Sequence, residues 1–191
     1  MATVSAYIAL GANLGDAAAA LRLAAKAIAQ LPQTQLVKAS RIYKTAPLVS
    51  GGDQPSAIDS APLGGDYLNA VVKVETGLSA PALLQSLQHI EQAAGRERPY
   101  PNAPRTLDLD LLLYGSASID SAQLTVPHPR MLVSAAAAQW GVDAGSLRTQ
   151  QGVVIGPGGK RLTYGELAEA AMTLSTAWVT TYCANGLTRI G

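Results

Sequence analysis

The sequence predicts an α+β fold in which helices pack on an antiparallel sheet. Apolar, β-branched stretches of strand length alternate with two amphipathic helical stretches, in the order strand, helix, strand, strand, helix, strand. The chain has 191 residues, 48% of them hydrophobic and 14% charged. This composition favours a folded domain with a real core, and the length allows one domain with an appendage.

The first half of the pattern covers the N-terminal stretch. Residues 4–10 are predicted to form a buried strand that ends in the turn Gly11-Ala-Asn-Leu-Gly15. Asp16 is a suitable N-cap for a helix over 17–31, because its side chain can accept hydrogen bonds from the first free amides. Residues 36–44 form the second predicted strand.

The second half follows a loop over 45–66 that is rich in Gly and Pro. Residues 67–76 form a third strand, Ser79 caps a helix over 80–94, and residues 106–114 form a fourth strand. This order is that of the ferredoxin-like βαββαβ unit. Its helices cover one face of the sheet, so we expect the other face to be free for a site.

The C-terminal stretch has weaker patterns. We expect an alanine-rich helix over 133–140, a short strand over 153–155 and a helix over 162–172. The change in pattern predicts a domain over 1–132 and an atypical C-terminal extension over 133–191.

Charge and cysteine content exclude several classes of protein. The net charge is +1, whereas nucleic-acid binders usually carry a basic surplus. The single cysteine, Cys183, cannot form a disulfide framework, which favours a reducing compartment. No stretch of eighteen apolar residues is present, and the N-terminus has no basic region of a signal peptide. We therefore expect a cytoplasmic monomer that binds neither nucleic acid nor membrane.

Asp108 and Asp110 form the most informative polar pair. They lie two apart on a predicted strand, so both side chains point to one face, with roughly 7 Å between their Cα atoms. Leu107, Leu109 and Leu111 fill the other face. Neighbouring carboxylates repel each other and favour a cation between them, and Mg²⁺ prefers such oxygen ligands. For a bare Asp-x-Asp pattern, the solvated polar face of an edge strand is the alternative.

Three arginines, Arg96, Arg98 and Arg105, lie close to this pair in sequence. Guanidinium groups hold phosphate oxygens bidentately while a metal bridges others. Arginines and aspartates together predict a site for a metal-bound phosphate compound, with phosphoryl transfer as its chemistry. A solvated basic loop paired with acids such as Glu97 is the alternative.

Three further features are weaker when taken alone. His128 is held rigidly between two prolines, and it could contact a phosphate or be structural. Tyr67 and Asn69 share one face of a strand, where a ring beside an amide suits a flat heterocycle. Gln88 and Glu91 share a helix face, for which ordinary helix surface is the alternative.

Seven sequence blocks occur in one order: Tyr7-Ile-Ala-Leu-Gly-Ala-Asn-Leu-Gly15, Tyr43-Lys-Thr-Ala-Pro-Leu48, Tyr67-Leu-Asn-Ala70, Ile90-Glu91, Gly95-Arg-Glu-Arg98, Pro104-Arg-Thr-Leu-Asp-Leu-Asp-Leu-Leu-Leu-Tyr-Gly115 and Leu124-Thr-Val-Pro-His-Pro-Arg-Met131. Over about residues 6–131 this series resembles the 6-hydroxymethyl-7,8-dihydropterin pyrophosphokinase family of folate biosynthesis.

The resemblance implies transfer of the β,γ-pyrophosphoryl group of ATP to the hydroxymethyl oxygen of 6-hydroxymethyl-7,8-dihydropterin, leaving AMP. It implies two Mg²⁺ ions on Asp108 and Asp110, with Arg96, Arg98 and Arg105 as the catalytic arginines. It implies ATP contacts at Gln88, Glu91, Leu111, Thr125 and His128. It implies pterin contacts at Gly11, Thr45, Leu48, Tyr67 and Asn69.

The sequence departs from the family after Met131. Ser134 and a run of alanines stand where an arginine and an aromatic residue are expected, and Arg130 and Arg148 are the candidates to supply the lost charge. Two interpretations stay open: a working pyrophosphokinase, and a catalytically impaired protein that still binds ATP or pterin. A nucleic-acid-binding domain of similar fold is disfavoured by the low aromatic content.

The tail has a resemblance of its own. The segments Ala135-Ala-Ala-Ala-Gln-Trp-Gly-Val-Asp-Ala144, Gln151-Gly-Val-Val154 and Gly159-Lys-Arg-Leu-Thr-Tyr-Gly-Glu-Leu-Ala168 are similar to a stretch of molybdenum-hydroxylase large subunits. No cofactor site is assigned to that stretch. The resemblance therefore implies a fused or recombined C-terminus, and no molybdenum chemistry is transferred to it.

Overall fold

The computed structural model describes residues 3–45, 65–95, 105–150, 152–164, 166–167 and 188–189. Within them the main sheet has six strands: β1 (Val4–Ala12), β2 (Thr34–Ala39), β3 (Tyr43–Thr45), β4 (Tyr67–Thr76), β5 (Asp108–Tyr114) and β11 (Thr188–Arg189). The α-helices with described bounds are α1 (Ala17–Ala29), α2 (Ala80–Ala93) and α3 (Pro129–Trp140). The protein is therefore a mixed α/β fold, as predicted.

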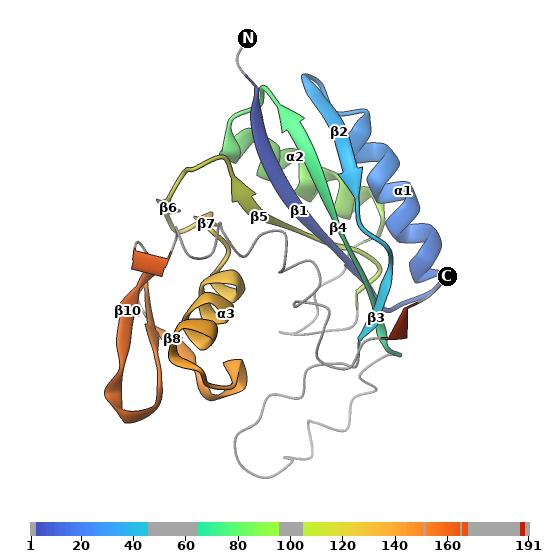
Figure 1. Ribbon diagram of the computed structural model, residues 1–191. Helices are drawn as coiled ribbons and strands as arrows, with labels where there is room; N and C mark the ends of the chain where they lie inside the picture. The colour runs from blue at the N-terminus through green and yellow to red at the C-terminus, as the bar shows by residue number, and fades with distance from the viewer. Residues whose placement is uncertain are drawn as a thin grey trace.

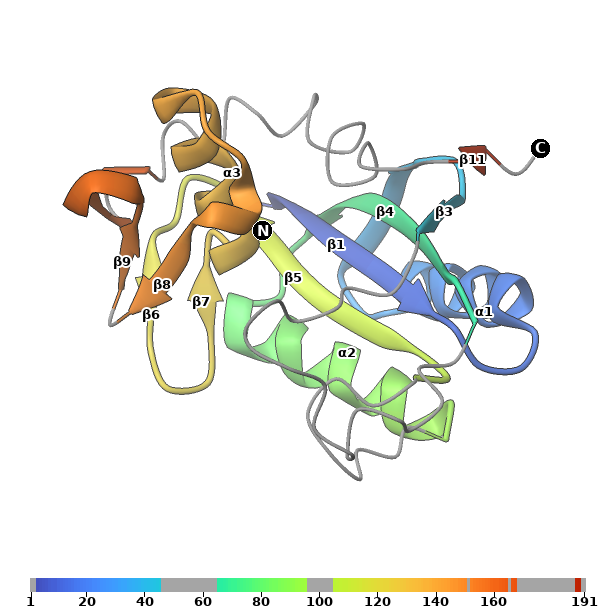
Figure 2. The ribbon, with the colours of Figure 1, turned by 90° about the horizontal axis from the view of Figure 1, so that it is seen from below.

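The main sheet is antiparallel, in the order β11–β3–β4–β1–β5, and β2 also pairs with β4. Helices α1 and α2 lie behind the sheet in Figure 1. Helix α3 lies on the opposite side, as the view from below in Figure 2 shows. We call the face turned away from α1 and α2 the open face.

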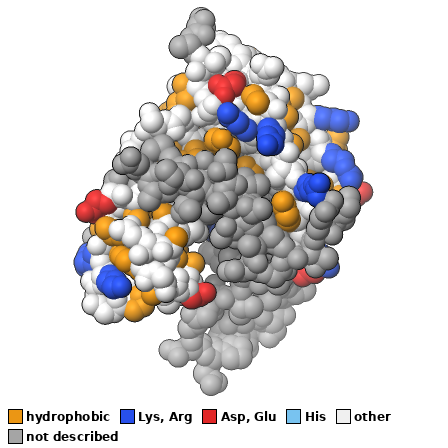
Figure 3. Space-filling view, viewed as in Figure 1, with side chains coloured by type: hydrophobic (Ala, Val, Ile, Leu, Met, Phe, Trp, Pro, Cys, Tyr) orange, Lys and Arg blue, Asp and Glu red, His pale blue; other side chains and the backbone are white. Residues whose placement is uncertain are grey.

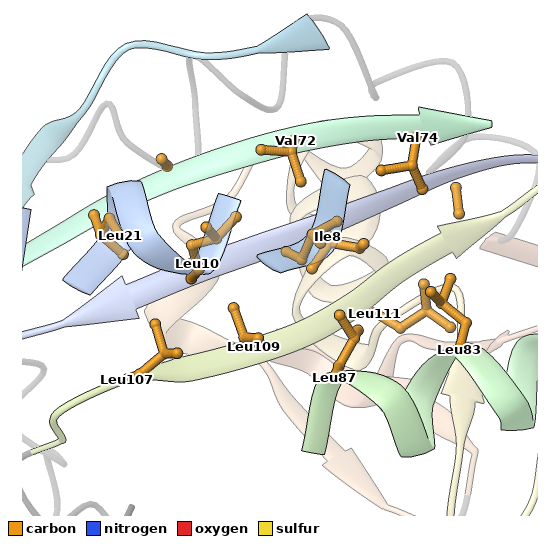
Figure 4. Close-up of a cluster of buried hydrophobic side chains, with 14 of the residues drawn as sticks. Ile8, Leu10, Leu21, Val72, Val74, Leu83, Leu87, Leu107, Leu109 and Leu111 are labelled. Atoms are coloured by element: carbon orange, nitrogen blue, oxygen red, sulfur yellow. The ribbon is translucent and has the colours of Figure 1, made fainter. Parts of the chain in front are cut away.

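The main core lies between the sheet and helices α1 and α2. Alternate residues of β1, β4 and β5 point toward the helices, and the apolar stripes of α1 and α2 meet them (Figure 4). The largest side chains of this cluster include Ile8, Leu10, Leu21, Ile28, Val72, Val74, Leu83, Leu87, Leu107, Leu109 and Leu111. One strand of alternating leucines and aspartates can therefore serve the core and the open face at once.

Both predicted helix caps are present. The Asp16 side chain accepts a hydrogen bond from the Ala19 amide at 2.9 Å, and that of Ser79 accepts one from the Ala82 amide at 3.4 Å. These bonds satisfy amides that have no partner within a helix. Helix α1 ends at Ala29, two residues before the predicted end. Among the described residues, no helix is long and apolar enough to cross a membrane.

The open face is less open than predicted. A second apolar cluster joins Ala9, Val71 and Leu113 of the sheet to Met131 and Leu132 of α3. The prediction of a wholly free face was wrong because α3 buries its own apolar stripe there. The helix crosses the predicted domain boundary after residue 132, and that boundary stays a prediction.

Two predicted elements differ from the structure by an interruption or by more than two residues at an end. The strand predicted over 36–44 is broken into β2 and β3, because Ser40 bonds to Val71 through its amide (2.8 Å) and its hydroxyl (2.9 Å). The helix predicted over 133–140 begins earlier, at Pro129, because the His128 side chain caps it and accepts from the Arg130 amide at 3.3 Å. Both differences arise from side-chain bonds to the backbone.

The rest of the chain forms small elements beside α3. A hairpin pairs β6 (Ile119–Asp120) with β7 (Thr125–Val126), and a second sheet joins β8 (Arg148–Gln150), β9 (Val153–Ile155) and β10 (Arg161–Thr163). Short 3₁₀ turns occupy Ala144–Ser146 and Pro157–Gly159. The predicted strand 153–155 is confirmed. The helix predicted over 162–172 begins two residues later than predicted, because Leu162 and Thr163 pair with β9. Tyr164, Glu166 and Leu167 are helical, and the residues from 168 lie outside the described residues, as do residues 46–64 of the predicted loop.

Two leucines of α1 test the account of the core. Leu21 is 2% exposed against the sheet, whereas Leu23 is 65% exposed. We expect Leu21→Ala to lower the free energy of unfolding by about 2–5 kcal/mol, since it leaves a cavity in the core. The matched Leu23→Ala change should alter it by less than about 0.5 kcal/mol. Urea titration followed by circular dichroism measures both, and equal effects would contradict the assigned core.

Candidate active site

The aspartate pair lies on the open face of β5. Leu109 and Leu111 point into the main core, so alternation turns Asp108 and Asp110 the other way, as the sequence predicted. Both aspartates are half-buried. The charge of Asp108 acts on Asp110, and both carboxylates act on His128. Their neighbours across the sheet on β1 are small: Gly11 is the register partner of Asp108, and Ala9 that of Asp110. The floor beside the pair therefore carries no large side chain from β1.

The surroundings of Asp110 disfavour its charged form. Burial raises its pKa above the ordinary value for aspartate, and the charge of Asp108 raises it further. His128, Arg130 and Arg105 act in the opposite direction. A carboxylate pair that repels itself in a half-buried place is a fitting donor set for a divalent cation, which would relieve the repulsion.

Arg105 partners the first aspartate. Its guanidinium forms an ion pair with the Asp108 carboxylate. The backbone of Arg105 is bonded to the turn after β1: its amide donates to Asn13 Oδ1 (2.8 Å), and its carbonyl accepts from the amides of Asn13 (3.0 Å) and Leu14 (3.2 Å). The turn that precedes α1 therefore fixes where Arg105 enters the site.

His128 is tied to the other end of β5. Its backbone amide donates to the Leu112 carbonyl at 2.9 Å, and its Nδ1 accepts from the Arg130 amide. Burial lowers the pKa of His128, which favours the neutral ring, although the charge of Asp110 opposes this. In a neutral ring whose Nδ1 accepts, the proton lies on Nε2. His128 can therefore donate from Nε2 to an anionic ligand.

One row of residues crosses the open face beside the aspartates. Tyr43 pairs with Asn69, Asn69 with Gly11, and Gly11 with Asp108. A Cβ on Gly11 would lie 3.2 Å from Asn69 Oδ1, so glycine keeps this crossing uncrowded. Tyr67 shares the parity of Asn69 and is the register partner of Thr45. The structure thus brings Gly11, Tyr67 and Asn69 together with the Thr45 backbone at the same end of the sheet.

Two residues predicted to contact ATP lie behind β5. Glu91 is 1% exposed, and its Oε1 accepts from the Leu109 amide at 2.7 Å, between the two aspartates. Leu111 is 2% exposed in the main core. The structure therefore gives these two side chains supporting positions under the strand and does not bring them onto the open face.

Other predicted ATP residues lie near a groove. Gln88 lines a groove between α2 and the β6–β7 hairpin, with Ser79, Ala82, Leu84, Ile119 and Leu124 among its other walls. Thr125, in β7, follows Leu124 directly and donates to Asp120 Oδ1 at 3.3 Å. The predicted residues Arg96, Arg98 and Leu48 lie outside the described residues.

Sequence reasoning missed the role of Asn13 and left Arg130 as one of two candidates. Asn13 was predicted only as part of a turn, although it is 8% exposed and bonds Arg105 across 92 residues of sequence. Arg130 acts on both Asp110 and His128, whereas Arg148 lies on β8 and is not among the charges that act on either. A buried asparagine in a glycine-flanked turn is the signal that could have indicated Asn13.

The basic residues at the other end of the open face form a separate cluster. Figure 3 shows Lys and Arg side chains gathered over the upper part of this face. Lys38 of β2 is the register partner of Lys73 of β4. Lys73 Nζ lies 3.7 Å from Glu75 Oε1 and 6.0 Å from the centre of the Tyr7 ring. These contacts are internal to the sheet surface and do not involve the aspartate pair.

The site geometry defines a class of protein. Two carboxylates on one face, Arg105 paired with the first, Arg130 among the charges that act on the second, and a histidine with a lowered pKa suit a magnesium-bound phosphate compound. Among the described residues no three His, Cys, Asp or Glu side chains gather around one point. Mg²⁺ is commonly held by one or two carboxylates together with waters and phosphate oxygens. This is typical of phosphoryl-transfer enzymes, whose Mg²⁺ is shared with a nucleotide.

The comparisons name the family. The profile of the 7,8-dihydro-6-hydroxymethylpterin-pyrophosphokinase (HPPK) family matches residues 7–138. The chain is 48% identical over 125 residues to the 2-amino-4-hydroxy-6-hydroxymethyldihydropteridine pyrophosphokinase of Haemophilus influenzae. This match covers 65% of this chain and 71% of that one. It is 41% identical over 129 residues to the enzyme of that name from Pseudomonas putida, covering 68% and 98%. The chain belongs to the HPPK family.

A solved structure agrees on the fold alone. The crystal structure of Plasmodium falciparum HPPK-DHPS A437G with SDX-DHP matches with a TM-score of 0.50 and 13% identity. The match covers 98% of this chain and 46% of that one, so this chain spans less than half of that longer protein. The family match runs past Met131 to residue 138 and so includes most of α3.

Replacement of each aspartate by asparagine should change the stability of the protein in opposite directions. Because the raised pKa of Asp110 means that its charge destabilises the folded state at neutral pH, Asp110→Asn should raise the melting temperature at pH 7 in metal-free buffer. The gain should shrink as the pH falls through the raised pKa, and vanish below the unfolded value of about 3.9. Calorimetry at several pH values measures this.

Asp108→Asn is the matched change. It breaks the ion pair with a partly buried Arg105, so the free energy of unfolding should fall by about 1.5–3 kcal/mol. Two variants that shift the melting temperature in the same direction would show that the aspartates do not have the different environments described above.

Proposed function

We propose that this chain transfers the β,γ-pyrophosphoryl group of ATP to the hydroxymethyl oxygen of 6-hydroxymethyl-7,8-dihydropterin. The pterin oxygen forms a bond to the β-phosphorus, the bond from that phosphorus to the α-phosphate oxygen breaks, and AMP leaves while the hydroxyl proton is released. The supporting observation is the aspartate pair beside Arg105 and His128 in a chain of the HPPK family. The named relatives make this active interpretation the favoured one, ahead of a catalytically impaired binding protein.

The residues at the metal end have distinct parts. We assign Asp108 and Asp110 to two Mg²⁺ ions, because two repelling carboxylates on one face fit divalent cations. When bound, the metal supplies charge neutralisation and alignment of the phosphate oxygens. Arg105 holds Asp108 and lies beside the phosphates, and His128 donates from Nε2 to a phosphate oxygen. Arg96 and Arg98 are assigned to the phosphates by the family resemblance alone.

The nucleotide and the pterin occupy different parts of the chain in this proposal. Gln88 and Thr125 lie toward the groove beside α2, which suits the nucleoside part of ATP. Glu91 and Leu111 act from behind β5, by holding the strand in place. The pterin lies over the row at the far end of the sheet, against Gly11, Thr45, Leu48, Tyr67 and Asn69. An aromatic ring and an amide there suit a flat, hydrogen-bonding heterocycle.

We also propose a topology, an oligomeric state, a cellular location and a domain division for the chain. The strand order β2/β3–β4–β1–β5 supports a ferredoxin-like body. We propose a monomeric enzyme of the cytoplasm, in keeping with a single cysteine and the absence of a basic surplus. The body over 1–132 carries the site, and the extension over 133–191 contributes through α3. The molybdenum-hydroxylase resemblance of the extension adds no chemistry to this proposal.

Turnover tests the proposal directly. Incubation of the full chain with ATP, Mg²⁺ and 6-hydroxymethyl-7,8-dihydropterin should form AMP and the pterin diphosphate in equal amounts. Asp110→Asn should lower the rate by at least about 100-fold, since it removes a charge used to hold the metal. The matched Asp143→Asn change, at a solvent-exposed turn, should leave the rate within about twofold. The proposal fails if the folded wild-type protein forms no AMP.

A further inference from the structure

The first turn of α3 carries an arginine next to the aspartate pair. Arg130 is exposed at the surface, and its charge acts on both Asp110 and His128. The turn that carries it is anchored from two sides: His128 bonds the Leu112 carbonyl on β5, and Met131 and Leu132 are buried in the second core. The arginine therefore has a fixed base and an exposed charged end.

The position of Arg130 complements that of Arg105. Arg105 precedes β5 and pairs with Asp108 near the start of the strand. Arg130 lies two residues after His128, whose amide donates to the Leu112 carbonyl, two residues beyond Asp110. The backbone that carries Arg105 and the turn that carries Arg130 thus meet β5 on either side of the pair. A polyphosphate bound across the pair would have a cation at each end.

Two hydrogen bonds of Arg130 at the start of the helix are made by its backbone. Its backbone amide makes the capping bond to His128 Nδ1, and its carbonyl accepts from Ser134 Oγ at 3.0 Å. Both bonds belong to backbone atoms and survive truncation of the side chain. The guanidinium can therefore be removed without removing the contacts described for the helix start.

We propose that the Arg130 guanidinium binds the β- and γ-phosphate oxygens of ATP, from the end of β5 opposite Arg105. This inference deepens the proposed function and rests on it for the identity of the ligand. Guanidinium is planar, always charged and able to hold two phosphate oxygens at once, which suits it to this part better than lysine. Arg130 is then a substrate-binding residue supplied by the helix that crosses into the C-terminal extension.

A purely structural role for Arg130 would lead to a different result. In that case the guanidinium would only offset the repulsion within the aspartate pair. Its removal would then lower the melting temperature and leave the preference for ATP over AMP unchanged. A phosphate contact should instead change that preference, because AMP has neither of the phosphates concerned.

The test compares Arg130→Ala with Arg148→Ala, an exposed arginine on β8. Isothermal titration calorimetry gives the affinity of each full-length variant for ATP with Mg²⁺, in the absence of pterin, and competition gives the affinity for AMP. Arg130→Ala should weaken ATP binding by about 10- to 100-fold, the range of one charge-assisted contact, and leave AMP binding within about twofold. Arg130→Lys should fall between wild type and Arg130→Ala.

The outcomes separate this inference from the proposed function. Equal ATP affinities for Arg130→Ala and Arg148→Ala, or parallel losses of ATP and AMP binding, would overturn the inference. A selective loss of ATP affinity would support it even if the wild-type protein formed no AMP, a result that would sink only the proposed function. Circular dichroism and melting curves show whether each variant is folded, and Arg130→Lys provides the comparison if Arg130→Ala is not.

Discussion

The repulsion between two half-buried carboxylates on β5 is the constraint around which the site is built. Burial and the neighbouring charge both raise the pKa of Asp110, so the folded protein holds this group at a cost. Two positive groups oppose these effects: Arg105 pairs with Asp108, and Arg130 acts on Asp110. These groups moderate the repulsion without removing it. The remaining negative potential favours a divalent cation in the proposed function.

The same strand also belongs to the core, and this links the site to the stability of the protein. Leu107, Leu109 and Leu111 alternate with the aspartates and lie in the main core, where β5 packs against α2. The buried Glu91 carboxylate bonds the Leu109 amide directly between the two aspartates. A change on the core side of β5 would therefore move the carboxylates. The floor of the site is therefore part of the same sheet that carries the main core.

The sequence predicted most of this where the signal was local. Strand β4 has the predicted bounds, and α2 ends one residue before its predicted end, because alternation, the Ser79 cap and Gly95 are visible in a single stretch. The shared face of the aspartates likewise follows from parity alone. The structure differs from the prediction where residues distant in sequence meet. Ser40 interrupts a predicted strand by bonding Val71, and Arg105 donates to the Asn13 side chain, 92 residues away in sequence. Sequence patterns carry no direct record of such contacts.

In the proposed function Asp108 and Asp110 hold the metal ions at the ATP site, and a paramagnetic probe tests this directly. Mn²⁺ can replace Mg²⁺ at oxygen-ligand sites, and it broadens the NMR signals of nearby nuclei. In ¹⁵N-labelled protein with ATP, substoichiometric Mn²⁺ should first broaden the backbone amides of Asp108, Leu109, Asp110 and His128. It should leave the amides of Lys38 and Lys73, at the other end of the sheet, sharp at the same ratio. Broadening centred away from β5, or unchanged in the Asp110→Asn variant, would contradict the central claim.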